Sequence, residues 1–425
     1  MANPGRAPTA GAVAAPERYG LFGTGAEYSV GVEEELMVLD AGTMALAPAA
    51  PGILRRTGEP ENIKPEIRQC MLEIASRPCR TTGELYDHLA TLRRRVAHAA
   101  ADQGYAVAGS GTHTFSRPED QLVTDTARYR YVITESGFPA RWSVVFGTHV
   151  HVALGSADKA IHVTEALLDD LPTLVALSAS SPVWNGVDTG MASTRLALWA
   201  SVPRSGLPPA FASFADYKAC LDTLHHSGAV PDASHVWWDV RSQDRLGTLE
   251  VRLLDGQPSL RDAVALAGLV QSLVRFHGRR WDAGERAKPH RFLVAENRWQ
   301  AVWRGMDARF AGTDGSVVPA RRAVDELLDR VAQDAADLET GWALAHLSDL
   351  ADRGGPAQRV RELLARTGDP SAVMRALVEL TLDGTEGAEA DGGGVTGRPT
   401  LVDVTDEQAI ETGIETQEAR GRAQI

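Results

Sequence analysis

The feature that most constrains the fold is an alternating stretch near the N-terminus, residues 28–38, with the sequence YSVGVEEELMV. Apolar and β-branched residues recur at every second position, which predicts a β-strand. Because successive side chains of a strand point to opposite faces, Glu34 shares the apolar face, while Glu33 and Glu35 lie beside Gly31 on the other. Two like charges on one face repel unless water or a cation lies between them. This strand alone therefore allows a solvent-exposed face or an ion-binding one.

Three later segments repeat the division into an apolar and a polar face. Their polar-face residues are Glu73 in 70–75, His149 and His151 in 144–152, and Glu250 and Arg252 in 248–253. If the four strands belong to one sheet, their polar sides form one concave surface, which we call the floor. Carboxylates and imidazoles are ligands that Mg²⁺ or Mn²⁺ can use. We therefore predict that the floor binds more than one divalent cation, through Glu33, Glu35, Glu73, His149 and Glu250.

A cluster of divalent cations needs an anionic partner, and a nucleoside triphosphate is the usual one. Three arginines, Arg195, Arg241 and Arg252, are placed to bind phosphate oxygens or a substrate carboxylate through paired hydrogen bonds. The chain has no Walker A sequence and no GxGxxG motif after a predicted strand. Its four lysines do not fall in a phosphate-binding motif. Metals and arginines must then contact the phosphates. Ser180 and Ser181, which precede a proline, are more simply helix-end caps than nucleophiles.

Composition excludes several other classes. The net charge of −13 and the isoelectric point of about 5.4 argue against a nucleic-acid-binding protein, which would carry a basic patch. Three cysteines are too few for a disulfide scaffold and indicate a reducing compartment. The sequence lacks an apolar run long enough to span a membrane, and its N-terminus does not look like a signal peptide. We therefore expect a cytoplasmic protein without a membrane partner.

The order of the predicted elements favours an α+β fold. Thr81 and Glu84 form a capping box that begins a helix ending at Gly104, and further strands cover 105–108 and 236–241. A helix is expected from about 157 to 181. Helices then gather late in the chain, at 260–281, 296–307, 319–337, 357–366 and 370–382. We predict a disordered N-terminal segment at 1–26, a single domain at 27–382, and a disordered, acidic tail at 383–425.

Several motifs of this chain resemble those of one family. They are GVEEE at 31–35, GTH at 111–113, GTHVHV at 147–152, ALSASSP at 176–182, DTG at 188–190, TLEVR at 248–252 and ENRW at 296–299. In this order, from about residue 27 to 382, they resemble the carboxylate–amine ligase family, also called glutamate–cysteine ligase type 2. Single motifs are modest evidence, whereas their ordered combination is specific.

The resemblance implies a fold similar to glutamine synthetase, in which a curved, largely antiparallel sheet holds the active site on its concave face and packs helices on its convex side. It also implies an ATP-dependent ligase that forms an amide through an acyl phosphate and releases ADP and phosphate. The default reaction joins glutamate and L-cysteine to γ-glutamylcysteine. The expected partners are amino-acid substrates. The sequence does not settle the oligomeric state, for which a homodimer is the candidate.

By motif match, the metal ligands for Mg²⁺ or Mn²⁺ would be Glu33, Glu35, Glu73, His149 and Glu250. The residues facing the nucleotide would be Arg241, Arg252 and His151, and those acting on the transferred phosphoryl group would be Arg195 and Arg252. The chain departs from the family pattern at 75–78, at Met191 and at 241–243. These departures concern the choice of amino-acid substrate more than the chemistry.

Three alternatives remain. The same chemistry could join a different carboxylate and amine. A metal-dependent hydrolase could use His149, His151 and a carboxylate to bind zinc, in which case ATP would have no effect. A non-catalytic binding protein could have kept the fold, although the full set of acidic and basic floor residues argues against it. The loop at 184–204 is our candidate lid over the site.

Overall fold

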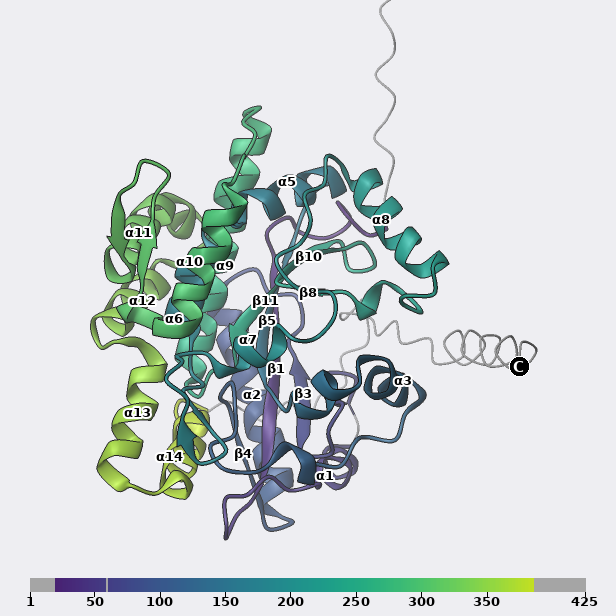
Figure 1. Ribbon diagram of the computed structural model, residues 1–425, viewed down its shortest axis with the longest axis vertical. Coiled ribbons are helices and arrows are strands. Elements are labelled where there is room, and N and C mark those ends of the chain that lie inside the picture. Colours follow the sequence, from purple (N-terminus) through teal and green to yellow (C-terminus); the bar gives the residue numbers. More distant parts are fainter. Residues whose placement is uncertain (1–19, 59, 386–425) are drawn as a thin grey trace, which may run out of the picture.

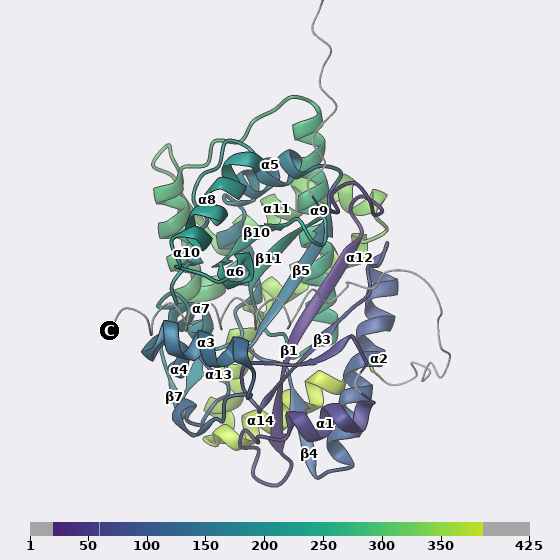
Figure 2. The ribbon, with the colours of Figure 1, turned by 90° about the vertical axis from the view of Figure 1, so that its right-hand side faces the viewer.

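A seven-stranded sheet runs through the middle of the molecule, in the order β10-β11-β5-β1-β3-β2, with β4 pairing the end of β1. The computed structural model describes residues 20–58 and 60–385. Every strand pair in this sheet is antiparallel, and the strands lie side by side in Figure 2. Their bounds are β1 Val30–Asp40, β2 Ile63–Pro65, β3 Met71–Ala75, β4 Tyr105–Ala108, β5 Gly147–Ala153, β10 Val240–Gln243 and β11 Thr248–Asp255. The predicted α+β class with a largely antiparallel sheet is confirmed.

The register of the strands brings the predicted polar residues together. Glu33 lies directly opposite His149, and Glu35 lies opposite Glu73. On the other side of β5, His151 lies opposite Glu250, which in turn lies opposite Arg241 on β10. Directly opposite residues of an antiparallel pair have neighbouring side chains on one face. The four alternating segments therefore belong to one sheet and share one polar face, as predicted.

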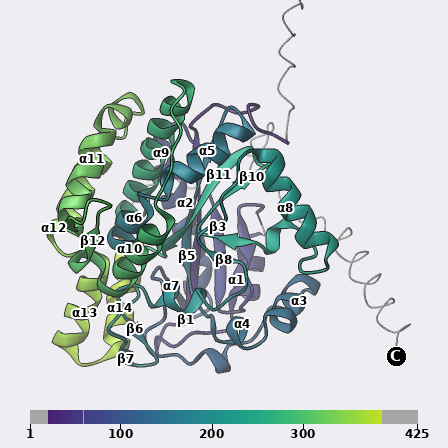
Figure 3. The ribbon, with the colours of Figure 1, turned by 45° about the horizontal axis from the view of Figure 1, so that its top comes forward.

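Helices lie on both sides of the sheet. The helices are α1 Ala50–Thr57, α2 Thr82–Ala101, α3 Ala127–Ser136, α4 Phe138–Trp142, α5 Ala157–Leu167, α6 Leu171–Ser178, α7 Thr194–Trp199, α8 Phe214–His226, α9 Leu260–Asp282, α10 Arg291–Arg304, α11 Ala320–Asp337, α12 Gly341–Asp352, α13 Gly355–Thr367 and α14 Pro370–Leu382. In Figure 1, α11, α12 and α13 stand beyond α9 on the left, and α3 and α8 lie on the right. In Figure 3 the strands stand between these two groups of helices.

Short strands and single helical turns complete the connections. Two-stranded pairs are formed by β6 Val183–Trp184 with β7 Val187–Asp188, by β8 Ser205–Gly206 with β9 Trp237–Trp238, and by β12 Arg309–Ala311 with β13 Val317–Pro319. The single 3₁₀ turns are η1 Pro118–Asp120, η2 Ala233–His235 and η3 Gly305–Asp307. The short strands β6 to β9 and the turn η2 all lie in the connection between β5 and β10.

The main core lies between the apolar face of the sheet and helices α2, α5 and α9. Val32, Val150 and Val251, from three neighbouring strands, are fully buried in one cluster with Leu89 of α2 and Leu273 of α9. At about 25 cal/mol per Å² of apolar surface removed from water, this layer is the main stabilising contact of the fold. It fixes which face of each strand is apolar, and so which face carries the floor.

Glu34 is the one carboxylate of β1 on the apolar face, and it is paired. Arg93 of α2 donates from Nε and Nη2 to the two Glu34 carboxylate oxygens, at 2.9 and 2.6 Å. Arg93 is completely buried and also donates to the backbone carbonyls of Gln257, Pro258 and Thr381. Glu34 is therefore a structural residue, paired with Arg93 inside the core.

Two helix predictions were wrong. The helix expected at 157–181 is two helices, α5 and α6, because Asp170 takes the position before α6 and Pro172 lies in the first turn of α6. Helix α12 was not predicted at all, although Ala343, Leu347 and Leu350 recur at helical spacing and are buried. Both errors lie outside the polar strands, so the floor is unaffected.

The predicted disordered segments fall mostly outside the described residues, which exclude 1–19 and 386–425. Residues 20–26, at the end of the N-terminal segment, are described and contact the domain. Phe22 is buried and packs edge-on against Phe214 of α8, with ring centroids 5.7 Å apart. At the other end, Tyr86 donates a hydrogen bond to the Gly384 carbonyl. Across the described part of the chain, helices fall short of the length and apolar character needed to cross a membrane.

Candidate active site

Three side chains on the floor bring their ligand atoms close together. Glu33 of β1, His149 of β5 and Glu250 of β11 each offer one nitrogen or oxygen atom, and these atoms lie within 4.8 Å of one another. His149 Nδ1 is 3.2 Å from Glu33 Oε2. Two carboxylates and an imidazole on rigid neighbouring strands match the donors that Mg²⁺ and Mn²⁺ accept. The residues present therefore fit a divalent cation at this point.

Glu250 is also the centre of a network of hydrogen-bond donors. Arg241 Nε donates to Glu250 Oε2 at 2.5 Å, and Gln243 Nε2 donates to the same oxygen at 2.6 Å. Arg252 donates to Glu250 Oε1. Burial would raise the pKa of Glu250, but Arg241 and Arg252 hold that pKa well below its ordinary value. The predicted arginines thus lie on the floor, beside the predicted metal ligands.

A second group of acids extends the floor toward β3, where the carboxylates repel one another. Glu35 and Glu73 lie opposite each other, and Glu66 lies close enough to both to affect their charge. Burial, with repulsion from Glu33 and Glu66, raises the pKa of Glu73 well above its ordinary value. Burial and the charge of Glu35 raise the pKa of Glu66 to about 7. A cation would relieve this repulsion, which is the property expected where more than one ion binds.

The pKa values of the two floor histidines shift in opposite directions. Burial and the nearby Arg252 charge lower the pKa of His149 to about 4, so at neutral pH its ring is neutral and has a free electron pair for a metal. Burial would also lower the pKa of His151, but Glu33 and Glu250 raise it above its ordinary value. His151 Nδ1 is 3.0 Å from Thr248 Oγ, and Nε2 is 3.5 Å from Glu33 Oε1. His151 therefore lies between Glu33 and Glu250, the two carboxylates that together with His149 could hold a divalent cation.

Arg195 of α7 reaches the same region from above β5. Its guanidinium lies so close to the backbone of Gly147 that a Cβ at that position would overlap it. Nη2 donates to the Arg252 carbonyl at 3.1 Å, whereas Nε and Nη1 are buried and make no hydrogen bond to the described residues. Buried guanidinium donors are rarely left without acceptors. These two atoms are suited to an anionic substrate group.

Asp255, at the end of β11, holds the segment that carries Arg195. It accepts hydrogen bonds from the Ser180 backbone at 2.9 Å and from the hydroxyls of Ser181 and Ser193 at 2.7 and 2.8 Å. Ser193 is the residue before α7, and its hydroxyl accepts from the Leu196 backbone. The Ser181 hydroxyl accepts from the Arg195 backbone at 3.1 Å. These serines therefore fix α7 to the sheet, which differs from the simple helix-end caps that we expected.

The floor also contains residues that the sequence prediction missed. Glu66 precedes β3 in an irregular stretch, and Asp255 follows an irregularity in the β5–β11 pairing, so alternation did not mark either residue. Arg298, inside the ENRW motif, donates to both oxygens of Asp239 at 2.6 and 3.0 Å. The shared face of Asp239 and Arg241 and the motif itself were both visible in the sequence, but their pairing was not.

Comparisons with known proteins agree with this geometry. The model of glutamate-cysteine ligase family 2 (GCS2) matches residues 29–380, and the chain belongs to this family. A Rubrobacter xylanophilus protein named "Putative glutamate--cysteine ligase 2-1" is 40% identical over 357 residues, which cover 83% of this chain and 95% of that protein. A Ruegeria pomeroyi protein named "Putative glutamate--cysteine ligase 2" is 37% identical over 365 residues, covering 83% of this chain and 94% of that protein.

Two solved structures share the fold. The glutamate–cysteine ligase of Francisella tularensis, solved in complex with AMP, superposes with a TM-score of 0.63 at 12% identity, covering 92% of this chain and 93% of that one. A bifunctional glutathione synthetase from Pasteurella multocida superposes with a TM-score of 0.62 at 16% identity, covering 84% of this chain and 52% of that one. At these identities the likeness establishes the fold, and the family membership establishes the ligase class.

Proposed function

We propose that this protein is an ATP-dependent carboxylate–amine ligase whose active site is the floor of the sheet, with glutamate and L-cysteine as its default substrates. The observation that carries the proposal is the meeting of Glu33, His149 and Glu250 within 4.8 Å. The buried guanidinium group of Arg195 and that of Arg252, whose side chain is 14% exposed, lie at the same floor. A triphosphate needs both cations and guanidinium groups around it, and this floor supplies residues for both.

The ligands that we assign to Mg²⁺ or Mn²⁺ are Glu33, His149 and Glu250, with Glu35 and Glu73 as the basis of a further site next to them. Divalent cations in such sites neutralise developing phosphoryl charge. Glu66 lies beside the second pair and is a further candidate. The strands hold these carboxylates rigidly, so their positions require little rearrangement when the substrate binds.

The arginines orient the reacting groups. Arg252 keeps Nε buried and without a hydrogen bond to the described residues, and we assign it to the ATP phosphates together with Arg241 and His151. Arg195 Nε and Nη1 make no hydrogen bond to the described residues, although Nη1 lies 3.9 Å from Asp255 Oδ1. We assign these two donors to the transferred phosphoryl group or the substrate carboxylate. In the reaction, a carboxylate oxygen of the acid substrate attacks the γ-phosphorus of ATP. ADP leaves, and the amine then displaces phosphate from the acyl phosphate.

Substrate identity is the part of the proposal that the geometry constrains least. Gln243 stands in the segment where the chain departs from the family pattern, and its amide donates to Glu250. A change at this position alters the shape of the floor near the arginines without removing a charge. A different carboxylate or amine is therefore the main alternative. The cytoplasmic location and the homodimer stay predictions.

The test is ADP release measured across a panel of amino acids, with each candidate amine present or absent. We expect release that requires ATP, a divalent cation and one acid–amine pair, and that falls at least about a hundredfold in Glu33→Gln. The Arg322→Ala variant, on the exposed surface of α11, is the matched control and should be unaffected. Zinc-dependent hydrolysis without ADP release would instead identify the hydrolase.

A further inference from the structure

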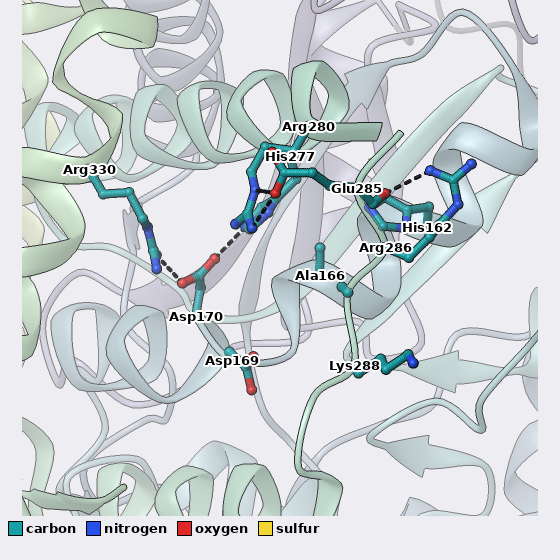
Figure 4. A pocket seen from close by; sticks show the side chains of 11 residues that line it. His162, Ala166, Asp169, Asp170, His277, Arg280, Glu285, Arg286, Lys288 and Arg330 are labelled. Atoms are coloured by element: carbon teal, nitrogen blue, oxygen red, sulfur yellow. Dashed lines mark hydrogen bonds and ion pairs between the residues drawn. The ribbon is translucent and has the colours of Figure 1, made fainter. Parts of the chain in front are cut away.

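The floor is largely closed to solvent. The side chains of Glu33 and Glu35 are only 19% and 15% exposed. A hollow of about 230 Å³ lies elsewhere, among α5, α9 and α11 (Figure 4), and its lining residues all stand outside the strands. In that hollow Asp170 pairs with His277 and Arg330, as the dashed lines show. If the floor takes a triphosphate, as proposed above, a segment that covers the floor must move to admit it.

Helix α3 lies over the acidic end of the floor. The Tyr129 hydroxyl donates to the carbonyl of Pro65 at 3.2 Å, and Pro65 directly precedes Glu66. Burial, with the charges of Glu66 and Glu73, raises the pKa of Tyr129 well above its ordinary value, so its phenol group lies near both carboxylates. In Figure 1, α3 stands to the right of the strands, on the side opposite α9. Helix α3 therefore covers these acids on the polar side of the sheet.

The chain is fixed on both sides of α3. Before the helix, the Thr124 backbone donates to the Ile67 carbonyl at 3.0 Å. After it, the buried Arg68 donates to the carbonyls of Ala140 and Arg141 in α4, at 3.0 and 2.8 Å. Movement in this region is therefore confined to α3 and the short joints on either side of it.

The joint after α3 is a single glycine. Gly137 ends α3 and begins α4, and its backbone has φ 58° and ψ −131°, a combination that other residues rarely adopt. At the other end, the Thr126 hydroxyl accepts from the Tyr129 backbone at 3.2 Å and caps the helix. Hinges are a few positions at the ends of elements that absorb a change in φ and ψ. Gly137 has the position and the conformational freedom of a hinge between the two helices.

Helix α3 is held by little apolar packing. Val132 is its one buried apolar residue, and it packs with Trp237 in a small cluster that is separate from the main core. On the same side of the sheet, α8 places Phe214, Tyr217 and Leu221 in the main core. Elements with few buried apolar contacts open locally at low cost in free energy. Helix α3 should therefore open more readily than α8.

Two contacts hold α3 against the turn η2. Arg128 Nη1 donates to the Ser234 hydroxyl at 2.5 Å. The Tyr131 ring meets the His235 ring edge-on, with the ring centroids 5.4 Å apart. A hydrogen bond and a ring contact between partly exposed groups are weak enough to break and re-form during turnover.

We propose that α3 is a lid over the floor, which opens about Gly137 and closes when Arg128 binds Ser234. Only the identity of the ligand that closes the lid rests on the proposed function. The lid is thereby assigned to α3 instead of the loop at 184–204, in which α7 is held to the sheet through Ser193 and Asp255. A closed lid would exclude water from an acyl phosphate on the floor.

Hydrogen exchange read by mass spectrometry tests the lid, with α8 as the matched helix. Without ligand, we expect the central amides of α3 to exchange at least about tenfold faster than those of α8. Mg²⁺ with β,γ-imido-ATP should slow α3 about tenfold and leave α8 unchanged. Exchange of α3 as slow as that of α8 would overturn the lid, as would unchanged α3 exchange when calorimetry shows that the nucleotide binds. Absence of nucleotide binding would count against the proposed function instead, and the ligand-free comparison would then decide the lid.

Variants test the latch between α3 and η2. Arg128→Ala and Ser234→Ala should each speed α3 exchange about fivefold, the effect of one lost hydrogen bond, without changing α8. The control is Arg130→Ala on the same helix, where the side chain is 62% exposed and pairs with Asp125 at the surface. This variant should leave α3 exchange within about twofold of the wild type. Wild-type exchange in Arg128→Ala would overturn the latch, as would equal acceleration by Arg128→Ala and Arg130→Ala.

Discussion

Each face of the central sheet carries a buried carboxylate paired with arginine, Glu34 on the apolar face and Glu250 on the floor, but the floor also carries acids that repel one another. Beneath β1, Glu34 receives two hydrogen bonds from Arg93, which donates three more to backbone carbonyls. On the floor, Glu66 and Glu73 face further carboxylates, and their pKa values rise because of burial and mutual repulsion. The difference separates a carboxylate that stabilises the fold from carboxylates that we propose bind a cation.

This contrast follows from strand geometry. Residues 33, 34 and 35 are adjacent in sequence but alternate between the faces, so one strand supplies both the structural pair and the floor. Breaking a buried ion pair whose hydrogen bonds are all satisfied destabilises the fold strongly. Carboxylates that repel one another instead lower the stability of the folded protein in the absence of a bound cation. Substitutions on the two faces should therefore have opposite consequences.

The largest expected effect is on stability and comes from Glu34→Gln. This change leaves the Arg93 charge buried without its partner, which typically costs about 3–5 kcal/mol. Urea unfolding should show this loss, while turnover per folded molecule stays near that of the wild type. A stable but inactive Glu34→Gln protein would mean that the strand register is wrong by one residue.

The next effect is on catalysis and comes from Glu33→Gln and Glu35→Gln. Each removes a charged group from the floor, and we expect turnover to fall on the order of a hundredfold, about 3 kcal/mol. Folding should survive in both variants. For Glu33 the two histidines lower the pKa, so the gain in metal-free stability expected from relieved repulsion should appear with Glu35→Gln and not with Glu33→Gln. Near-normal turnover in either variant would remove that residue from the site.

A smaller effect is expected from Asp255→Asn, which weakens the hydrogen bonds that place Arg195. We predict a loss of about tenfold in kcat/KM, with binding of the acid substrate affected more than binding of ATP. Asp262→Asn is the matched control, because Asp262 is equally buried but bonds to His346 away from the floor. Equal losses of activity in Asp255→Asn and Asp262→Asn would show that Asp255 stabilises the fold and does not position Arg195 for catalysis.

The smallest effect concerns pH. A carboxylate whose folded pKa is raised stabilises the fold below its unfolded pKa, and this contribution is lost as pH rises through the folded value. Glu66, with a pKa of about 7, should therefore make the metal-free protein less stable as pH rises from about 5 to 8, by on the order of 1 kcal/mol. Glu66→Gln should lessen this decline. The same slope in both proteins would show that Glu66 does not titrate in this range.

The floor could be predicted from the sequence because alternation is a local property. Glu33, Glu73, His149 and Glu250 each stand on a strand with a clear apolar face, and burial of that face determines the direction of the polar one. In the structure, the pairing register of the strands places these residues next to one another. Glu34 was separable from Glu33 and Glu35 for the same reason.

The remaining residues depend on contacts between distant segments. Asp255 is defined by serines more than 60 positions earlier in the chain, and Glu66 by its approach to β1 rather than by its own neighbours. The break between α5 and α6 was missed although Asp169, Asp170 and Pro172 mark it in the sequence.

The most direct test of the account is a calorimetric titration of ATP with Mg²⁺ present and with EDTA in its place. The central claim is that the floor, acidic in the absence of metal, binds a triphosphate only through divalent cations. We predict measurable ATP binding with Mg²⁺ and at least about tenfold weaker binding with EDTA, with Glu33→Gln resembling the EDTA result even when Mg²⁺ is present. ATP binding of equal strength with EDTA would contradict the claim.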